Sequence, residues 1–142
     1  MSDVIQKRLY VAEATVVGGR GGHGRTSDGM LDVNIRRPVE LGGAGGGTNP
    51  EQLFAVGYGA CFQSAMSLAG KEFGVDTSRS TLTARVALGP IDEGRYGLAV
   101  ELEVSIPGVE PEVAEKILKR THEVCPYSNA TRGNIEVTLK VV

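Results

Sequence analysis

The sequence has few side chains that could bind a metal ion, with only two cysteines and two histidines among 142 residues. Cys61 and Cys125 stand far apart in the chain, so they form neither a CxxC redox motif nor one half of a cysteine-rich zinc site. We therefore expect no metal ion, and the two thiols need another explanation.

The chain also lacks an excess of positive charge and a long apolar run. Its formal net charge is −2 and its pI is near 5.7, which gives no basic surface for nucleic acid. No run of about 18 apolar residues is present, so we expect no membrane span. The first ten residues, MSDVIQKRLY, lack the apolar core of a signal peptide, which predicts a cytoplasmic location.

Glycine is abundant, with 20 residues, but it does not recur at a fixed period. It clusters in VVGGRGGHGR and LGGAGGGTNP, which excludes a collagen-like or repeat protein. No GK[ST] follows the second cluster, so a loop is favoured over a phosphate-binding site. A length of 142 residues fits one domain, residues 1–142, that is large enough to bury a core.

Apolar residues alternate with polar ones in several segments, which is typical of β-strands. Val100, Leu102 and Val104 alternate with Glu101 and Glu103. The predicted strands are a hairpin formed by 8–17 and 30–35, a second hairpin formed by 80–89 and 95–106, and a final strand over 134–142.

Two segments have the signals of α-helices. Thr48 or Asn49 can cap a helix that starts at Pro50, runs to about Phe73 and stops at Gly74. A second helix starts at Pro111 and ends where Pro126 disfavours a helical residue before it. The order ββ-α-ββ-α-β predicts an α+β domain built on antiparallel sheet.

The first predicted helix carries apolar or small residues on every side, so we expect it to be buried. Cys61 lies in its middle, where a free cysteine is usually a small hydrophobic residue. Gly57 and Ala65 flank it by one turn, so another element can approach the sulfur closely. Cys125 lies at a helix end, and the two thiols suit a peroxide-attacking cysteine and a resolving partner. Two unrelated cysteines remain an equal alternative from these residues alone.

Three motifs together resemble one known family. They are GGR (18–20), ELGGAGGGTNPEQLFAVGYGACF (40–62) and VCPYSNATRGNIEV (124–137). In this order and spacing they resemble the organic hydroperoxide resistance (Ohr) proteins of the Ohr/OsmC family. The resemblance implies that Cys61 is the peroxidatic nucleophile, that Cys125 resolves it as a disulfide, and that Arg20 and Glu51 complete the catalytic site.

The same resemblance implies the rest of the function. The expected activity is a cysteine-based peroxidase for organic hydroperoxides, including fatty-acid hydroperoxides. It would bind no cofactor and would be reduced by a dithiol such as dihydrolipoamide or a lipoylated protein. Arg25, in the glycine-rich loop after Arg20, is a rival for the cationic role. A non-enzymatic binder of apolar ligands, with incidental thiols, is the alternative function.

Two further expectations concern charge and assembly. Arg20 should lower the pKa of Cys61 below the usual value of about 8.5. Glu51 and Cys61 are ten residues apart, which is about 15 Å on one straight helix. That exceeds the reach of one hydrogen-bonded group, yet the resemblance implies that both lie in one site. Either Arg20 bridges a bent helix, or Arg20 and Glu51 come from a second subunit, and we favour the second. The fold would then be an intertwined homodimer, in which antiparallel sheets surround a buried central helix.

Overall fold

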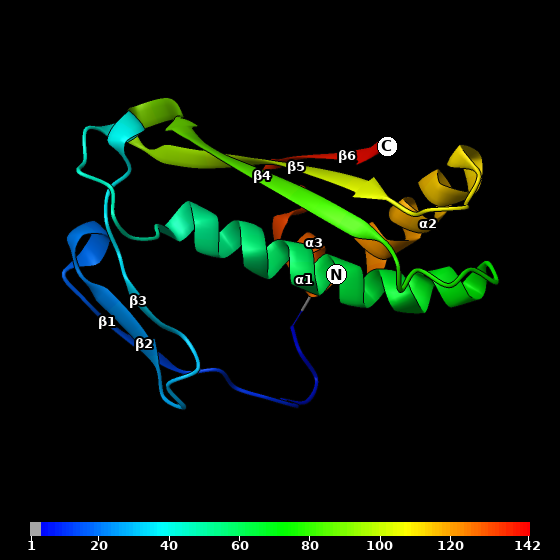
Figure 1. Ribbon diagram of the computed structural model, residues 1–142, viewed down its shortest axis with the longest axis horizontal. Helices are drawn as coiled ribbons and strands as arrows, with labels where there is room; N and C mark the ends of the chain where they lie inside the picture. The colour runs from blue at the N-terminus through cyan, green and yellow to red at the C-terminus, as the bar shows by residue number, and fades with distance from the viewer. Residues whose placement is uncertain (1–3) are drawn as a thin grey trace. The chain divides into compact units, whose positions relative to one another are not determined.

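The computed structural model describes residues 4–142 and divides the chain into two compact units, one that ends at Leu53 and one over Phe54–Val142. The first unit contains a three-stranded antiparallel sheet, drawn in blue in Figure 1, in the order β1-β2-β3. Its strands are β1 (Ala14–Val17), β2 (His23–Thr26) and β3 (Asp32–Asn34), and it also has the short 3-10 helices η1 (Gly19–Gly21) and η2 (Val39–Leu41).

The predicted pairing in this unit is wrong, because β2 lies between the two expected strands. Gly18 and Gly19 have φ values of 76° and 54°, so the chain reverses directly after β1. Gly29, with φ 74°, reverses it again before β3. The segment HGRT of β2 has no apolar alternation, which is why the sequence pattern did not identify it as a strand.

The second unit has a three-stranded sheet in the order β4-β5-β6. Its strands are β4 (Thr81–Pro90), β5 (Tyr96–Ser105) and β6 (Glu136–Val141), and the 3-10 turn η3 (Asp92–Gly94) joins the first two. The antiparallel β4–β5 hairpin confirms the prediction. The prediction of a purely antiparallel sheet is wrong for this unit, because β6 pairs parallel to β5. The chain reaches β6 only after crossing the sheet through two helices, as a parallel connection requires.

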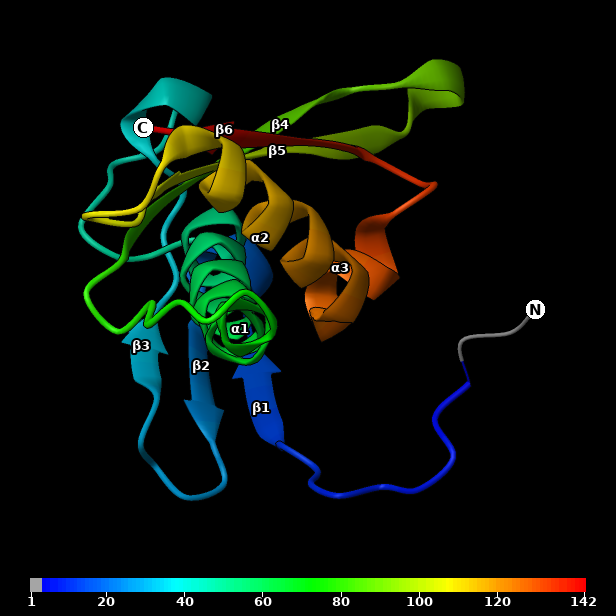
Figure 2. The ribbon, with the colours of Figure 1, turned by 90° about the vertical axis from the view of Figure 1, so that its right-hand side faces the viewer.

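Three helices lie on one side of this sheet (Figures 1 and 2). α1 covers Pro50–Glu72. Asn49 caps its start, because the side-chain oxygen accepts a 2.9 Å hydrogen bond from the backbone N–H of Gln52. Gly74, with φ 69°, follows its end. α2 covers Pro111–Val124. The short α3 (Pro126–Thr131) was not predicted, since one turn and a half gives almost no periodic signal.

The core of the second unit lies between α1, α2 and the sheet, as the end-on view of α1 in Figure 2 shows. Its largest fully buried side chains include Tyr58, Phe62, Met66, Leu102 and Ile117. The expected burial of α1 on most sides is only partly correct for the single chain. Val56 is 72% exposed and Leu68 60% exposed, so α1 keeps two large apolar side chains uncovered.

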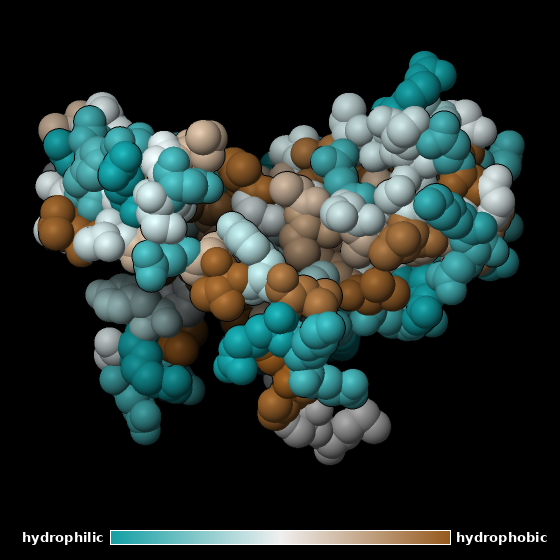
Figure 3. Space-filling view, turned by 90° about the horizontal axis from the view of Figure 1, so that it is seen from below, coloured by the Kyte–Doolittle hydropathy of each residue, from teal (hydrophilic) through white to brown (hydrophobic). Residues whose placement is uncertain are grey.

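Apolar surface lies open elsewhere too, as brown areas beside teal ones in Figure 3 show. No helix within residues 4–142 is both long and apolar enough to cross a membrane. The mixed architecture of helices and sheets confirms the predicted α+β class.

Candidate active site

The two cysteines lie side by side in the second unit. The sulfur of Cys125 is 3.6 Å from the sulfur of Cys61, and both are free thiols. Pro126 excludes a helical conformation at Cys125, which has φ −61° and ψ 126°, so the chain turns between α2 and α3 there. Cys125 is fully buried, whereas Cys61 on α1 is partly exposed. Of the two sulfurs, Cys61 is therefore the more open to a substrate.

Aromatic rings line α1 close to the thiols. A Cβ atom added to Gly57 would lie 2.9 Å from the hydroxyl of Tyr127, so the glycine allows this ring to lie against the helix. The ring centroids of Phe54 and Tyr58 are 5.9 Å and 5.6 Å from that of Tyr127, respectively. The predicted close approach one turn before Cys61 is thus present, and Tyr127 makes it.

The pKa of the Cys61 thiol is raised above its usual range, chiefly because burial disfavours the thiolate. A hydrogen bond from the backbone N–H of Tyr127 acts in the opposite direction but does not reverse this shift. Arg20 is not among the groups that shift this pKa, so the expectation that Arg20 lowers it stays a prediction. A reactive thiolate at Cys61 therefore requires a positive charge brought to the sulfur.

Arg20 and Glu51 form a second pair, within the first unit. The two terminal nitrogens of Arg20 donate hydrogen bonds of 2.9 Å and 2.7 Å to the two carboxylate oxygens of Glu51. This is the fork-to-fork geometry in which guanidinium and carboxylate groups fix each other's orientation. The Arg20 side chain is 32% exposed and that of Glu51 15% exposed. The hydrogen bonds from Arg20 lower the pKa of Glu51, which therefore stays ionised.

The rival cation, Arg25, has a different environment. Its side chain is 60% exposed, and its Nε lies 3.3 Å from a carboxylate oxygen of Asp32. Arg25 thus belongs to the surface of the small sheet, where exposed ion pairs contribute little. Of the two arginines, Arg20 is the one that pairs with Glu51.

The structure brings the four residues predicted for the site together as two pairs, Arg20 with Glu51 and Cys61 with Cys125. Residues 4–142 contain no group of three or more His, Cys, Asp or Glu side chains that could hold a metal ion.

The sequence did not point to a group of polar side chains on the helices that flank the cysteines. His122 is half-buried and hydrogen-bonded to the buried Ser128. His122 stands three positions before Cys125 and Ser128 three positions after it, and this spacing is the one signal in the sequence that could have indicated them.

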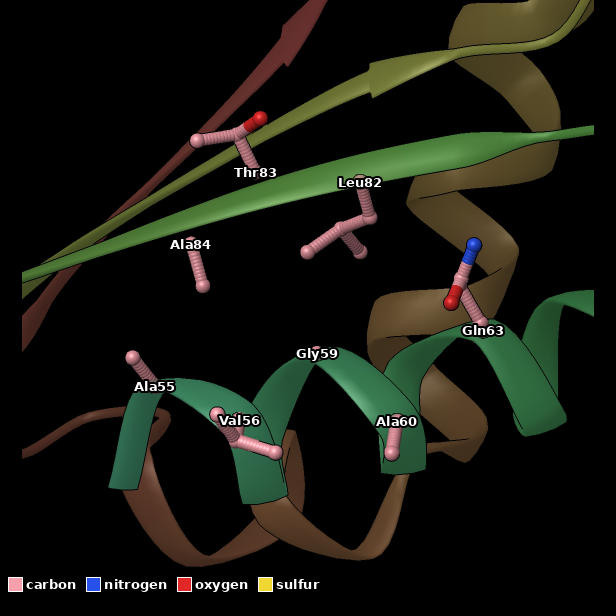
Figure 4. A pocket seen from close by; sticks show the side chains of 8 residues that line it. All are labelled: Ala55, Val56, Gly59, Ala60, Gln63, Leu82, Thr83 and Ala84. Carbon is pink, nitrogen blue, oxygen red and sulfur yellow. The ribbon is translucent and has the colours of Figure 1, made fainter. Parts of the chain in front are cut away.

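An open groove of about 440 Å³ lies between α1 and β4 (Figure 4). Leu82 and Ala84 point from the strand toward the helix, where Gly59 leaves space between Ala55 and Gln63. The lining is mostly apolar and small. This groove and the exposed Val56 lie on the part of α1 that the single chain leaves uncovered.

Comparisons with known proteins identify the family. The OsmC-like protein family matches residues 43–140. The organic hydroperoxide resistance protein of Xanthomonas axonopodis pv. citri is 48% identical over 136 residues, covering 94% of this chain and 95% of that protein. The organic hydroperoxide resistance protein OhrB of Bacillus subtilis is 40% identical over 134 residues, covering 94% and 98%.

Solved structures agree with this result. An organic hydroperoxide resistance protein from Elizabethkingia anophelis superposes with a TM-score of 0.89 at 50% identity, covering 96% of this chain and 98% of that one. A protein from Vibrio cholerae described as a putative organic hydroperoxide resistance protein gives a TM-score of 0.92 at 42% identity, covering 99% and 96%. The chain belongs to the OsmC-like family and, within it, to the organic hydroperoxide resistance proteins.

Proposed function

We propose that this protein is a thiol-dependent peroxidase that reduces organic hydroperoxides, including fatty-acid hydroperoxides, to alcohols. The observation that carries the proposal is the 3.6 Å approach of the Cys61 and Cys125 sulfurs. It occurs in a chain whose relatives, at 40% and 48% identity, are named for resistance to organic hydroperoxides. The apolar and aromatic surroundings of the thiols suit the organic part of such a substrate.

The reaction begins at the more accessible sulfur. The Cys61 thiolate attacks a peroxide oxygen of ROOH, the O–O bond breaks, and the departing alkoxide takes up a proton to leave as ROH. Cys61 is then a sulfenic acid. The Cys125 sulfur attacks the Cys61 sulfur, the S–O bond breaks, and water leaves as the disulfide forms. This second step protects Cys61 from irreversible oxidation to sulfinic acid.

The positive charge that this chemistry needs is assigned to Arg20. Burial raises the pKa of Cys61, and a guanidinium near the sulfur would lower it and stabilise the negative charge on the departing oxygen. Glu51 would keep the guanidinium in place through its two hydrogen bonds. The carboxylate also lies in the first turn of α1, where the helix dipole favours a negative charge.

The proposed assembly is a homodimer in which Arg20 and Glu51 of one chain serve Cys61 of the other. α1 is a single helix from Pro50 to Glu72, so the ten residues between Glu51 and Cys61 correspond to about 15 Å of rise. A second chain would also cover exposed apolar side chains of α1, Val56 and Leu68.

The remaining parts of the cycle follow the family. A cytoplasmic dithiol of the lipoyl type, free or on a lipoylated protein, would reduce the Cys61–Cys125 disulfide by thiol–disulfide exchange. The protein would hold no bound cofactor, because the two thiols and the external dithiol carry all the electrons.

A thiol titration tests the enzyme against the alternative, a non-enzymatic binder of apolar ligands that would use the groove of Figure 4. The reduced protein is incubated with cumene hydroperoxide, and free thiols are counted under denaturing conditions. We expect the loss of both thiols of each chain and the release of one cumyl alcohol. Cys61→Ser is the control and should retain its single thiol. Unchanged thiols in the wild-type protein would favour the binder.

A further inference from the structure

A chain of hydrogen-bonded polar side chains lies inside the second unit. The hydroxyl of Tyr58 is 2.9 Å from that of Ser128 and 3.0 Å from that of Thr131. The Nδ1 atom of His122 is 2.7 Å from the Ser128 hydroxyl. Tyr58 and Ser128 are fully buried, and Thr131 is 6% exposed. We call these four residues the Tyr58 network.

The Tyr58 network joins the three helices that meet at the thiol pair. Tyr58 stands on α1, three residues before Cys61. His122 stands on α2, three residues before Cys125, and Ser128 stands on α3, three residues after it. Three residues are nearly one helical turn, so these three network residues lie in the turns next to the cysteines, and Thr131 lies one turn farther along α3.

Burying hydroxyl groups costs free energy unless each finds a partner. Apolar side chains of the same size would fill the space without that requirement, so the hydrogen bonds add direction rather than mere cohesion. Hydrogen bonds have a narrow range of length and angle, so the chain of bonds at 2.7–3.0 Å specifies how the three helices meet more closely than non-directional apolar contacts would. Such constraints matter most where two reacting atoms must be held in line.

On these grounds we propose that the Tyr58 network is a positioning device that holds the Cys125 sulfur in line to attack the sulfenic acid of Cys61. The inference rests on the proposed peroxidase function. Cys125 lies outside both of its flanking helices and has an extended conformation, so the positions of α2 and α3 decide where its sulfur points. The network ties both helices to the helix that carries Cys61.

The hydroxyl of Tyr58 is the central member of the network, whichever atom of each hydrogen bond is the donor. If Nδ1 of His122 accepts, then Ser128 donates to His122, Tyr58 donates to Ser128, and Thr131 donates to Tyr58. If Nδ1 carries a proton, every donor reverses, and Thr131 donates to the backbone carbonyl of Ser128 at 3.3 Å. Both arrangements satisfy all four side chains, and both need the hydroxyl of Tyr58.

Tyr58→Phe removes that single oxygen and keeps the ring. Single-turnover kinetics with cumene hydroperoxide separate the two steps, with dimedone trapping for the sulfenic acid and thiol counting for the disulfide. We expect oxidation of Cys61 to keep its wild-type rate. Disulfide formation should slow by about tenfold, as for the loss of one buried hydrogen bond, and the dimedone adduct should increase.

Thr121→Val is the matched control. Thr121 is also fully buried, and its hydroxyl donates a 2.7 Å hydrogen bond to the Ile117 carbonyl, outside the Tyr58 network. It should lower thermal stability as Tyr58→Phe does and leave disulfide formation unchanged.

A second test compares His122→Asn, which keeps a polar atom near the Nδ1 position, with His122→Leu, which does not. Only His122→Leu should slow disulfide formation, and this half-buried position keeps the test open should Tyr58→Phe fail to fold.

Two results would overturn the positioning role: a wild-type rate of disulfide formation in Tyr58→Phe or His122→Leu, or an equal slowing in Thr121→Val. Failure of the proposed function gives a different result, because the wild-type thiols would then survive cumene hydroperoxide. Diamide, a thiol oxidant that also needs Cys125 to attack an activated Cys61, would still measure the second step. The same slowing in Tyr58→Phe is expected with diamide.

Discussion

The two residue pairs of the candidate site differ in almost every physical respect. Arg20 and Glu51 are charged, partly open to solvent, and satisfied by two hydrogen bonds to each other. Cys61 and Cys125 are free thiols in an apolar setting, where burial raises the pKa of Cys61. An apolar site suits an organic peroxide but suppresses the thiolate that the proposed reaction needs. In that proposal the charged pair supplies the positive charge that the thiol pair lacks, and the predictions below separate their contributions.

The largest expected effect is on the thiol pair. Cys61→Ser should abolish hydroperoxide reduction, by more than about a thousandfold, because the nucleophile of the reaction is removed. Cys125→Ser should instead keep the first step and lose the disulfide, so that dimedone traps a sulfenic acid at Cys61 and excess peroxide inactivates the protein faster. Steady-state assays and mass spectrometry check both variants. Measurable turnover by Cys61→Ser, with circular dichroism showing a native fold, would remove this residue from its role.

The next effect links the charged pair to the thiol pair. Arg20→Ala should raise the pKa of Cys61 and slow peroxide reduction by about a hundredfold, as expected when one charge-stabilising group is removed. The rate of alkylation by iodoacetamide against pH, measured in a Cys125→Ser background, gives the pKa of Cys61. Arg25→Ala is the matched control, since it removes an arginine paired with Asp32 on the same small unit. A shift with Arg25→Ala and none with Arg20→Ala would move the role to Arg25.

The fold and the site differ in how far the sequence predicts them. The β4–β5 hairpin follows from the alternation of Val100, Leu102 and Val104, because one face of a strand must be apolar to pack on α1. Strand β2 was missed because HGRT carries no such pattern, and its place depends on glycine turns. The parallel β6 depends on a crossover whose direction no local pattern records.

Within the site, only the resemblance to the family could relate Arg20 to Glu51, since spacing does not pair residues 31 positions apart. The Tyr58 network was missed for a similar reason. The two hydrogen bonds of Tyr58 join residues 70 and 73 positions apart, and a tyrosine among apolar residues is interpreted simply as part of the core. The raised pKa of Cys61 agrees with the predicted burial of its helix, whereas the lowering expected from Arg20 stays a prediction.

A smaller effect tests whether the two pairs meet between chains. Cys61→Ser and Arg20→Ala chains, each inactive alone, are mixed in equal amounts and refolded together. Half of the dimers should be mixed, each with one working site of two, so about a quarter of wild-type activity should return. If both pairs of one site came from the same chain, no activity would return. Sedimentation equilibrium should show a dimer at assay concentrations, and a monomer would contradict the assembly.

The smallest expected effect concerns the charged pair alone and is seen in stability. Arg20 lowers the pKa of Glu51, so the pair stabilises the folded state above the unfolded pKa of glutamate, about 4.3, and that contribution is lost as the pH falls through the lower folded value. Glu51→Gln should cost about 1 kcal/mol at pH 7, a modest value because Arg20 is partly open to solvent. Urea unfolding at pH 7, 5 and 3 should show the wild-type advantage shrink at the lowest pH, whereas Glu40→Gln, an exposed glutamate of the same unit, should change little. If the difference in unfolding free energy between wild type and Glu51→Gln stays constant from pH 7 to 3, the ionised carboxylate of Glu51 is not stabilised by Arg20. The proposal that Glu51 holds the arginine for Cys61 would then lose its physical basis.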